Sequence, residues 1–441
     1  MDLVKAAREL FASEARAFAV RLWDGSLLPP SGGGAARGVV VLTRPRALRV
    51  LAPPTSERRL AEAFLDGDLE LEGDACGLLE AAARWEGPRP RAGLLPALAT
   101  LLLSRPGSPA RSERASPRRL ARRHSIGRDR QAVRHHYDLS DDFYRLFLDR
   151  ELVYSCAYFA RPGMSLEAAQ EEKLELVCRK LALAPKERLL DVGCGWGALL
   201  LHAGSRHGAE AVGITLSAHQ LSEARRRIAA ASAGPRLAVE AADYRTFRAS
   251  SPFHKVASIG MMEHVGRERL PTYFRTIHRL LYPGGLLMNH AIADNSPGGG
   301  TTLPWAHRRS GGFIERYIFP DGDLVPLGQV VSAAEAAGFE VRDVESLREH
   351  YEETLLAWLA RLEARFEEAK ALVGERRARA YRLYLASSAA AFRLGRVSVF
   401  QLLLSKPALD GRAVGLPRSR AEWYREAVPE SDPLAGGAVG S

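Results

Sequence analysis

A loop of alternating glycines is the feature of this chain that points most directly to chemistry. It reads Asp191-Val-Gly193-Cys194-Gly195-Trp-Gly197 and lies between an apolar run and a helical pattern. Glycines let a backbone pass close to a ligand because no Cβ intervenes, and the start of a helix offers free N–H donors. The spacing is neither the GxGxxG of dinucleotide sites nor a P-loop, since no Lys-Ser/Thr follows. With an acid at the strand end, the loop suits a cationic or hydroxyl-bearing ligand such as S-adenosylmethionine.

A second polar cluster follows the next apolar run. The segment Gly213-Ile-Thr215-Leu216-Ser217 lacks the acid that class I methyltransferases usually place there for the ribose hydroxyls. Thr215 and Gln220 each offer a hydrogen-bond donor and acceptor, so we expect them to bind the ribose instead. Ser217 is at least as well suited to cap the helix that begins there.

Strand and helix patterns alternate from residue 186 onward, and these elements must position the two polar loops. Strands are expected in ERLLDVG, EAVGIT, RLAVEAAD, KVASIGM and GLLMNHAIA. Helices are expected over 196–207, 217–231, 267–281, 327–338, 352–373 and 375–394, with an insertion over 295–328 and a loop-rich segment from 406. The alternation predicts an α/β fold with a parallel, doubly wound sheet. With the loop that suits S-adenosylmethionine, we expect a class I methyltransferase sheet with helical insertions.

The N-terminal part has another pattern, which predicts a small α+β domain. We expect helices over 3–18 and 56–64 and short strands over 38–42 and 48–51. The predicted organisation is an N-terminal domain over 1–103, a linker over 104–130, a catalytic domain over 131–427 and a flexible C-terminal tail over 428–441.

The basic charge of the chain is concentrated in one segment. The formal net charge of the 441 residues is +10, and ten Arg against two acidic residues give +8 between Arg105 and Arg134. A solvated, flexible tether is one interpretation. Docking on an anionic phospholipid membrane surface is the sharper one, because each Arg near such a surface contributes about 1 kcal/mol. Nucleic acid binding is not expected, since the segment lacks interleaved aromatic residues and the chain has no zinc or RNP-type motif.

The cysteine content indicates the redox compartment of the protein, and its hydropathy indicates whether it spans a membrane. Four cysteines without a CxxC pair form no disulfide framework, so a reduced, cytoplasmic setting is expected. The N-terminus lacks the apolar core of a signal peptide. The longest apolar run is 12 residues and contains Pro96, whereas a membrane span needs about 20. We therefore expect a soluble protein that associates at most peripherally with a membrane.

Several motifs in a fixed order carry a family resemblance. They are His136-Tyr137-Asp138-Leu139-Ser140, Tyr154-Ser155-Cys156-Ala157-Tyr158, the glycine loop, Gly213 to Gln220, and Met262-Glu263-His264-Val265-Gly266. Together they resemble the cyclopropane-fatty-acyl-phospholipid synthases and the related mycolic acid cyclopropane synthases over residues 125–427. AEAFLDGDLELEGD resembles, less sharply, the N-terminal domain of the phospholipid-acting members, which implies lipid binding or dimerisation there and allows a homodimer.

The resemblance implies a specific reaction. The cis double bond of an unsaturated acyl chain attacks the methyl group of S-adenosylmethionine, a carbocation forms, and a bound bicarbonate ion removes a proton so that a cyclopropane ring closes. Matching positions place the bicarbonate ion among Cys156, Glu263, His290, the backbone of Ile292 and Tyr351. Taken singly, each of these residues has an ordinary structural interpretation, such as a buried thiol or a core histidine.

The resemblance also assigns cofactor contacts outside the two loops. Tyr137, Tyr154 and Ser155 match positions that approach S-adenosylmethionine from the segment before the sheet. Tyr244 and Arg245 match a further contact, and Tyr244 stands where relatives often have Trp, so we expect it to stack on adenine.

One departure from the family pattern bears on mechanism. Ser388 occupies the place of a Cys that was once regarded as the active-site residue of relatives. A thiol there cannot be essential to an active protein, which favours the bicarbonate mechanism. Alternatives remain open: a methylene- or methyl-branched product, methylation of a small molecule, and a lipid-binding protein with an inactive methyltransferase domain.

Overall fold

The computed structural model describes residues 3–12, 16–31, 35–51, 57–85, 127, 139–231, 236–295, 312–411 and 415–424. The predicted linker, apart from Gly127, and the predicted C-terminal tail therefore lie outside the described residues, as does the expected cofactor contact Tyr137.

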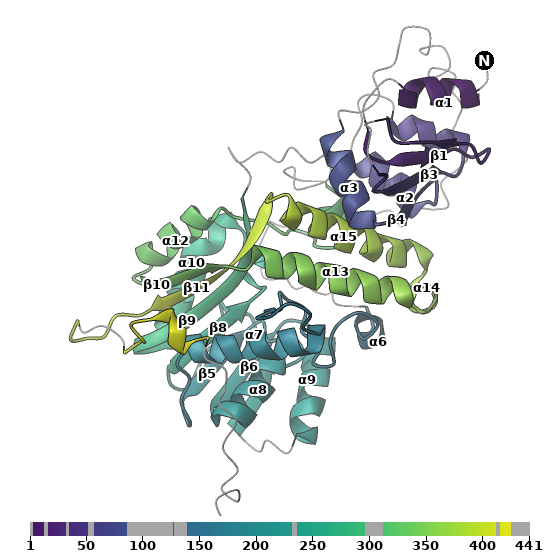
Figure 1. Cartoon of the computed structure of the whole chain (residues 1–441). Helices are drawn as coiled ribbons and strands as arrows, with labels where there is room; N and C mark the ends of the chain where they lie inside the picture. The colour runs from purple at the N-terminus through teal and green to yellow at the C-terminus, as the bar shows by residue number, and fades with distance from the viewer. Residues whose placement is uncertain are drawn as a thin grey trace, which may run out of the picture.

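A seven-stranded sheet forms the centre of the larger part of the molecule (Figure 1). Its order is β10-β11-β9-β8-β5-β6-β7, and only β11 runs antiparallel to its neighbours. The strands are β5 (Arg188–Val192), β6 (Glu210–Thr215), β7 (Leu237–Ala241), β8 (Phe253–Ile259), β9 (Leu281–Asp294), β10 (Glu340–Ser346) and β11 (Val397–Ser405). The central strands are almost wholly buried, as expected where helices cover both faces of a parallel sheet. The predicted α/β class is confirmed.

Helices connect and cover these strands. They are α6 (Asp141–Tyr144), α7 (Leu166–Lys180), α8 (Ala198–His207), α9 (Ala218–Ala230), α10 (Leu270–Leu280), α11 (Phe313–Tyr317), α12 (Leu327–Ala336), α13 (Arg348–Ala364), α14 (Phe366–Val373) and α15 (Glu375–Arg393). The described residues of this part also form the 3-10 helices η4 (Met262–His264), η5 (Arg267–Arg269) and η7 (Arg420–Glu422).

The structure differs from the expected elements at several places in this part. Strands β10 and β11 were not predicted, because one is short and charged and both lie among strong helical patterns. The single helix expected over 352–373 is two helices, α13 and α14, divided at Arg365. The helix expected from residue 267 begins at Leu270, after η5, where Pro271 occupies the first turn.

The N-terminal part forms a separate four-stranded sheet of order β2-β1-β3-β4, with helices beside it (Figure 1). Its elements are α1 (Leu3–Ala12), β1 (Ala19–Arg21), β2 (Leu27–Leu28), β3 (Gly38–Leu42), η1 (Pro45–Leu51), α2 (Glu57–Leu65), β4 (Leu69–Gly73) and α3 (Ala75–Arg84). The strand expected over 48–51 is the 3-10 helix η1, since Pro45 fixes a helical φ at its start.

The helix expected over 3–18 is also shorter than predicted. It ends at Ala12, and β1 begins at Ala19. Arg16 lies between them, 5% exposed, and donates to the carbonyl oxygens of Phe11 at 3.2 Å and Phe18 at 2.6 Å. Arg16 thus connects the end of α1 with the residue that precedes β1.

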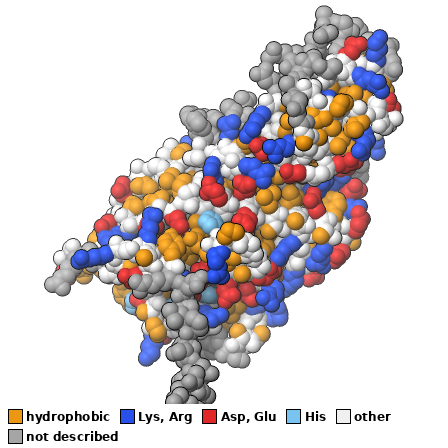
Figure 2. Space-filling view, viewed as in Figure 1, with side chains coloured by type: hydrophobic (Ala, Val, Ile, Leu, Met, Phe, Trp, Pro, Cys, Tyr) orange, Lys and Arg blue, Asp and Glu red, His pale blue; other side chains and the backbone are white. Residues whose placement is uncertain are grey.

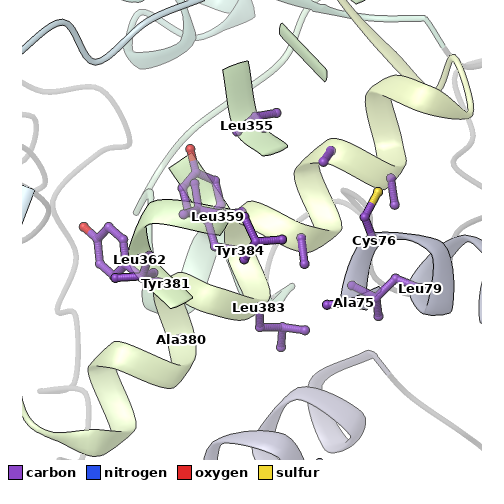
Figure 3. Packing of buried hydrophobic residues seen from close by; sticks show 14 of the residues in the cluster. Ala75, Cys76, Leu79, Leu355, Leu359, Leu362, Ala380, Tyr381, Leu383 and Tyr384 are labelled. Carbon is purple, nitrogen blue, oxygen red and sulfur yellow. The ribbon is translucent and has the colours of Figure 1, made fainter. Parts of the chain in front are cut away.

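Helix α15 of the larger part packs against the N-terminal sheet and its helices. Arg379, 6% exposed, donates to the carbonyl oxygens of Phe64 at 2.7 Å and Leu69 at 3.0 Å. Figure 3 shows Cys76 of α3 facing α15, while Tyr384 projects from that helix farther from α3. One helix therefore contacts the N-terminal part and, as shown below, the aromatic cluster beside the candidate site.

The described surface shows no concentration of one charge on the face in view. Figure 2 shows Lys and Arg side chains interspersed with Asp and Glu across it. Among the described residues, no helix is both long and apolar enough to cross a bilayer.

Candidate active site

The glycine loop turns between β5 and α8 at the carboxyl edge of the sheet. Gly193, Gly195 and Gly197 have φ angles of +84°, +53° and +83°, a region that side chains with a Cβ rarely adopt. A Cβ on Gly193 would lie 3.2 Å from Met261, and one on Gly213 in β6 would lie 2.7 Å from Cys194. The glycines are therefore required both for the shape of the loop and for its close packing.

A cavity opens above this loop, and most of the predicted cofactor contacts line it. Among the predicted residues these are Tyr154, Ser155, Asp191, Gly193, Cys194, Gly195, Thr215, Leu216, Gln220, Tyr244 and Arg245. Gly197 and Ser217 do not line it but begin helices α8 and α9. The cavity is thus bounded by the ends of four strands, β5, β6, β7 and β8, and by the segment that precedes the sheet.

The second polar loop is held together by its own hydrogen bonds. Thr215 Oγ1 donates to Gln220 Oε1 at 2.9 Å and accepts from the N–H of Ser217 at 3.2 Å. Ser217 Oγ accepts from the N–H of Gln220 at 3.3 Å, which is the predicted cap. These bonds leave the Gln220 amide N–H₂ as the donor from this loop for a hydroxyl-bearing ligand.

A buried lysine faces the acid of the glycine loop, and sequence reasoning missed it. Lys173 in α7 lines the cavity, is 1% exposed and donates to Ser155 Oγ at 2.9 Å. Burial lowers the pKa of Lys173 to about 8 and raises the pKa of Asp191 to about 7, with Lys173 opposing the latter shift. In the sequence, Lys173 is one charge in a helical EEKLEL pattern, which is typical of a solvated face.

The predicted Tyr244–Arg245 pair is fixed by Asp243. Arg245 donates from Nε to Asp243 Oδ1 at 2.8 Å and from Nη2 to Oδ2 at 2.6 Å. The guanidinium also lies 5.5 Å from the centre of the Tyr244 ring. All three residues line the cavity, so a flat aromatic surface is presented there on a rigid support.

The segment before the sheet is tied to the glycine loop by Trp196. Its Nε1 donates to Asp141 Oδ1 at 2.8 Å, and its ring lies 5.1 Å from that of Tyr144. Two motifs that are 55 residues apart in the sequence are therefore in contact at the cavity. Trp196 lines the cavity and was not among the predicted contacts.

Glu263, which is half-buried, and His290, which is 2% exposed, form a polar pair beside the cavity. Glu263 follows β8, and its Oε1 accepts from the N–H of Ile292 at 2.7 Å. His290 lies two residues earlier in β9, and its carbonyl oxygen accepts from the N–H of Gly260, a cavity residue, at 2.8 Å. Glu263 Oε2 and His290 Nε2 are buried and have no hydrogen-bond partner among the described residues. Unsatisfied buried polar atoms call for an explanation, and a bound ion or water molecule between these two atoms would supply one.

Burial gives the two groups of this pair perturbed acidities. It raises the pKa of Glu263 to about 7, although the bond from Ile292 opposes the shift. It lowers the pKa of His290 well below its ordinary value, and Lys173 and Lys180 add to that effect. Near neutral pH the histidine is therefore uncharged, and the carboxyl group of Glu263 can hold or release a proton.

Cys156 and Tyr351 are connected to this pair through Leu347. The Cys156 thiol contacts the carbonyl oxygen of Leu347 at 3.7 Å, and the N–H of Tyr351 donates to the same oxygen at 3.0 Å. The N–H of Leu347 donates to Val399, whose cross-strand neighbour is Ile292. Four of the five residues predicted for the bicarbonate pocket are thus linked through backbone contacts, and His290 lies two residues before Ile292 on β9. In this arrangement the Ile292 N–H is engaged by Glu263, and burial raises the pKa of Cys156, which suits a wall rather than a nucleophile.

Aromatic rings from three helices surround the segment that holds Tyr154. Its ring lies 5.5 Å from Tyr144 and 5.3 Å from Trp358, and on α15 the ring of Tyr384 lies 5.6 Å from Phe319. Faces of such rings attract cations. Apart from Tyr154, the members of this cluster were not predicted, because aromatic residues on helices are ordinarily core residues.

Cys178, His202 and His207 form another group whose donor atoms lie within 4.8 Å of one another. Glu175 Oε2 pairs with both histidines, at 2.8 and 3.0 Å, and Glu175 Oε1 accepts from Arg179 at 3.0 Å. These interactions connect α7 to α8, so a structural role in holding the two helices together explains the group.

Comparison with known proteins identifies the family. Residues 124–402 match the model of the mycolic acid cyclopropane synthetase family. The chain is 38% identical over 410 residues to a probable fatty acid methyltransferase of Pseudomonas putida, covering 92% of this chain and 96% of the relative. It is 40% identical over 278 residues to cyclopropane mycolic acid synthase 1 of Mycobacterium tuberculosis, covering 62% of this chain and 96% of that one.

Solved structures agree with this result. Mycolic acid cyclopropane synthase CmaA1, solved with SAH and CTAB, superposes with a TM-score of 0.60 at 39% identity, covering 63% of this chain and 98% of that one. Coclaurine N-methyltransferase, solved with SAH, shares the fold with a TM-score of 0.55 at 21% identity. The resemblance inferred from the motifs is thereby confirmed. The chain belongs to the mycolic acid cyclopropane synthetase family and is an S-adenosylmethionine-dependent methyltransferase of that family.

Proposed function

We propose that the protein transfers a methylene group from S-adenosylmethionine to the cis double bond of unsaturated phospholipid acyl chains and forms a cyclopropane ring. The observation that carries this proposal is the Glu263–His290 pair, with two unpartnered buried polar atoms beside the cofactor cavity. A transfer to oxygen or nitrogen needs only a base for a polar acceptor, whereas an alkene acceptor needs aromatic surfaces and a base sheltered from water.

The reaction balances as a substitution followed by ring closure. The π electrons of the double bond attack the methyl carbon of S-adenosylmethionine while the carbon–sulfur bond breaks, leaving S-adenosylhomocysteine and a carbocation on the acyl chain. Loss of one proton from the new methyl group leaves the electron pair that closes the ring. The aromatic cluster around Tyr154 and Trp358 suits the cation because ring faces stabilise positive charge.

The protein groups present fit a bicarbonate ion at the Glu263–His290 pair. An anion with an O–H group requires both acceptors and donors, and Glu263 Oε2 and His290 Nε2 are buried and have capacity for one bond each. When bound, bicarbonate would supply the base. Glu263, held by the N–H of Ile292, would orient that ion, and the side chains of Tyr351 and Cys156 would line its site.

The phospholipid part of the proposal rests on the N-terminal part of the chain. The relative from Pseudomonas putida, a probable fatty acid methyltransferase, aligns with 92% of this chain, and therefore also with residues of the N-terminal part. A methyltransferase for a small soluble acceptor has no need of a second domain with a basic linker. The helix α15 contact joins that domain to the aromatic cluster.

Expression in a bacterium that lacks its own cyclopropane synthase tests the proposal. Mass analysis of membrane fatty acids should show unsaturated chains that gain the mass of one CH₂ group and resist hydrogenation. Absence of any new lipid, with the protein folded and binding S-adenosylmethionine, would contradict the function. A product that takes up hydrogen would instead indicate a methylene branch, which the same carbocation gives when a different proton leaves.

Association with membranes is a separate part of the proposal. The +8 charge between residues 105 and 134 supports peripheral docking on anionic phospholipid. Binding to vesicles that contain an anionic lipid should weaken at high salt, because screening shortens the range of the attraction. Zwitterionic vesicles provide the control. Binding that is equal on both and insensitive to salt would refute the electrostatic role.

A further inference from the structure

A row of buried polar side chains leads from the back of His290 into the interior. Gln401 of β11 lies directly across from His290 of β9, and its Nε2 lies 3.3 Å from His290 Nδ1. On its other side, Gln401 Oε1 accepts from Lys180 Nζ of α7 at 2.9 Å. The exposed fractions of Lys180, Gln401 and His290 are 0%, 0% and 2%, so water does not compete for these bonds.

The lysine determines which way the glutamine amide points. An ammonium group has donors and no acceptor, so it must face the amide oxygen. Lys180 is itself held by Asp343, at 3.7 Å, and by Glu345, both on β10. Arg420 donates to the far side of Asp343 at 2.7 Å. The ammonium group is therefore fixed by charges at the edge of the sheet and cannot turn away from Gln401 without losing them.

The orientation of the amide then determines the proton position on His290. The Gln401 N–H₂ group has no acceptor, so the nitrogen it faces, Nδ1, must carry the lone pair. A neutral imidazole with a bare Nδ1 carries its proton on Nε2. In the opposite tautomer, the Nδ1–H of His290 would face the N–H₂ group of Gln401, so two donors would meet. If the amide were reversed instead, its N–H₂ group would face the ammonium group of Lys180, and again two donors would meet.

We propose that Gln401, oriented by Lys180, is a positioning residue that keeps His290 in the Nε2–H tautomer, so that the imidazole acts as a neutral hydrogen-bond donor toward the active site. Nε2 is the ring nitrogen left without a partner among the described residues. A neutral donor suits the oxygen of a small anion and does not take up the proton that the reaction releases. The catalytic consequence rests on the proposed function, whereas the tautomer itself does not.

Nitrogen NMR on the full chain with ¹⁵N-labelled histidine reads the tautomer directly. The chain has 12 histidines, and His290 is assigned by the signals that disappear in His290→Gln. We expect a pyridine-type Nδ1 and a pyrrole-type Nε2 near neutral pH. A pyrrole-type Nδ1 in the unmodified protein overturns the proposal, whatever the variants do.

Substitution of the glutamine supplies the second arm. Gln401→Glu has the same shape but only acceptors, so His290 Nδ1 should become protonated, either as the other tautomer or as imidazolium. Ser398→Ala, on the same strand and 2% exposed, is the matched control and should leave both signals unchanged. An unchanged His290 spectrum in folded Gln401→Glu also overturns the proposal.

Activity measurements separate this inference from the proposed function. With lipid substrate, turnover in Gln401→Glu should fall at least 10-fold, while affinity for S-adenosylmethionine changes by less than about twofold, because the other tautomer loses the Nε2 donor and an imidazolium is no longer a neutral donor. In Gln401→Met, which removes the amide without adding charge, turnover should fall less than in Gln401→Glu. Equal turnover in all three proteins overturns the catalytic consequence. If the unmodified protein has the expected tautomer but makes no lipid product, the proposed function fails and the positioning of His290 stands.

Discussion

The cofactor cavity and the Glu263–His290 pair share one edge of the sheet but are built in opposite ways. The cavity is shaped largely by backbone: three glycines at positive φ and the start of a helix. The pair is formed by ionisable side chains whose polar atoms are removed from water, which disfavours their charged forms and shifts their pKa values. Local sequence therefore determines the first region, whereas the second depends on contacts between residues far apart in the chain. Substitutions in the two regions should consequently fail in different ways.

The largest effect is expected from Glu263→Gln. The amide keeps the bond from the Ile292 N–H but places an N–H₂ donor where Glu263 Oε2 would orient the base, so turnover should fall about 10²- to 10⁴-fold. Affinity for S-adenosylmethionine, measured by isothermal titration, should stay unchanged because Glu263 is not among the residues that line the cavity. The matched control is Glu268→Gln, an exposed carboxylate in η5, which should retain full turnover. Full activity of Glu263→Gln would remove the pair from the mechanism.

Gly193→Ala should produce the converse failure. A residue with a Cβ at φ +84° costs about 1–2 kcal/mol, and this Cβ would also lie 3.2 Å from Met261. The loop must shift, so affinity for S-adenosylmethionine should fall about 10-fold or more, as titration would show. Gly163→Ala, at φ +79° with open space around it, carries the same strain outside the cavity. Gly163→Ala should lower the stability of the protein without changing its affinity for S-adenosylmethionine. An equal loss of this affinity in both variants would refute the role of the loop.

The contrast between the regions also explains what the sequence could predict. The glycine loop, the Ser217 cap and the alternation of β5 to β9 are local patterns, and each is present as expected. Lys173, Gln401 and the aromatic cluster were missed, because their roles arise only when α7, β11 and α13 come together. Strands β10 and β11 were missed for a related reason, since their sheet partners are distant in the chain. For β11 a local strand signal was overlooked: the run Val397-Ser-Val-Phe400 between Gly395 and Pro407.

Stability should depend on pH through the same buried carboxyl group. Because burial raises the pKa of Glu263 to about 7 from 4.5, the folded state holds a proton that the unfolded state has lost between these pH values. Stability from this group is thus present below about pH 4.5 and is lost as pH rises to about 7, by at most about 3 kcal/mol. Urea unfolding in carbonate-free buffer gives the free energy of unfolding at pH 5.5 and pH 8. The decrease between these two pH values should be smaller in Glu263→Gln than in the unmodified protein. An equal decrease in both proteins would mean that Glu263 is not desolvated.

The smallest effect is expected at Ser388, which lies outside both regions. It is half-buried on α15 and neither lines the cofactor cavity nor contacts the Glu263–His290 pair in any described hydrogen bond. Ser388→Cys and Ser388→Ala should therefore change turnover by less than about twofold, the scale of a substitution that touches no special feature. If Ser388→Cys were markedly faster than both Ser388→Ala and the unmodified protein, a thiol at this position would contribute to catalysis. The division of the site into a backbone-built cavity and one buried polar pair would then be incomplete, and α15 would have to be counted as a third functional element.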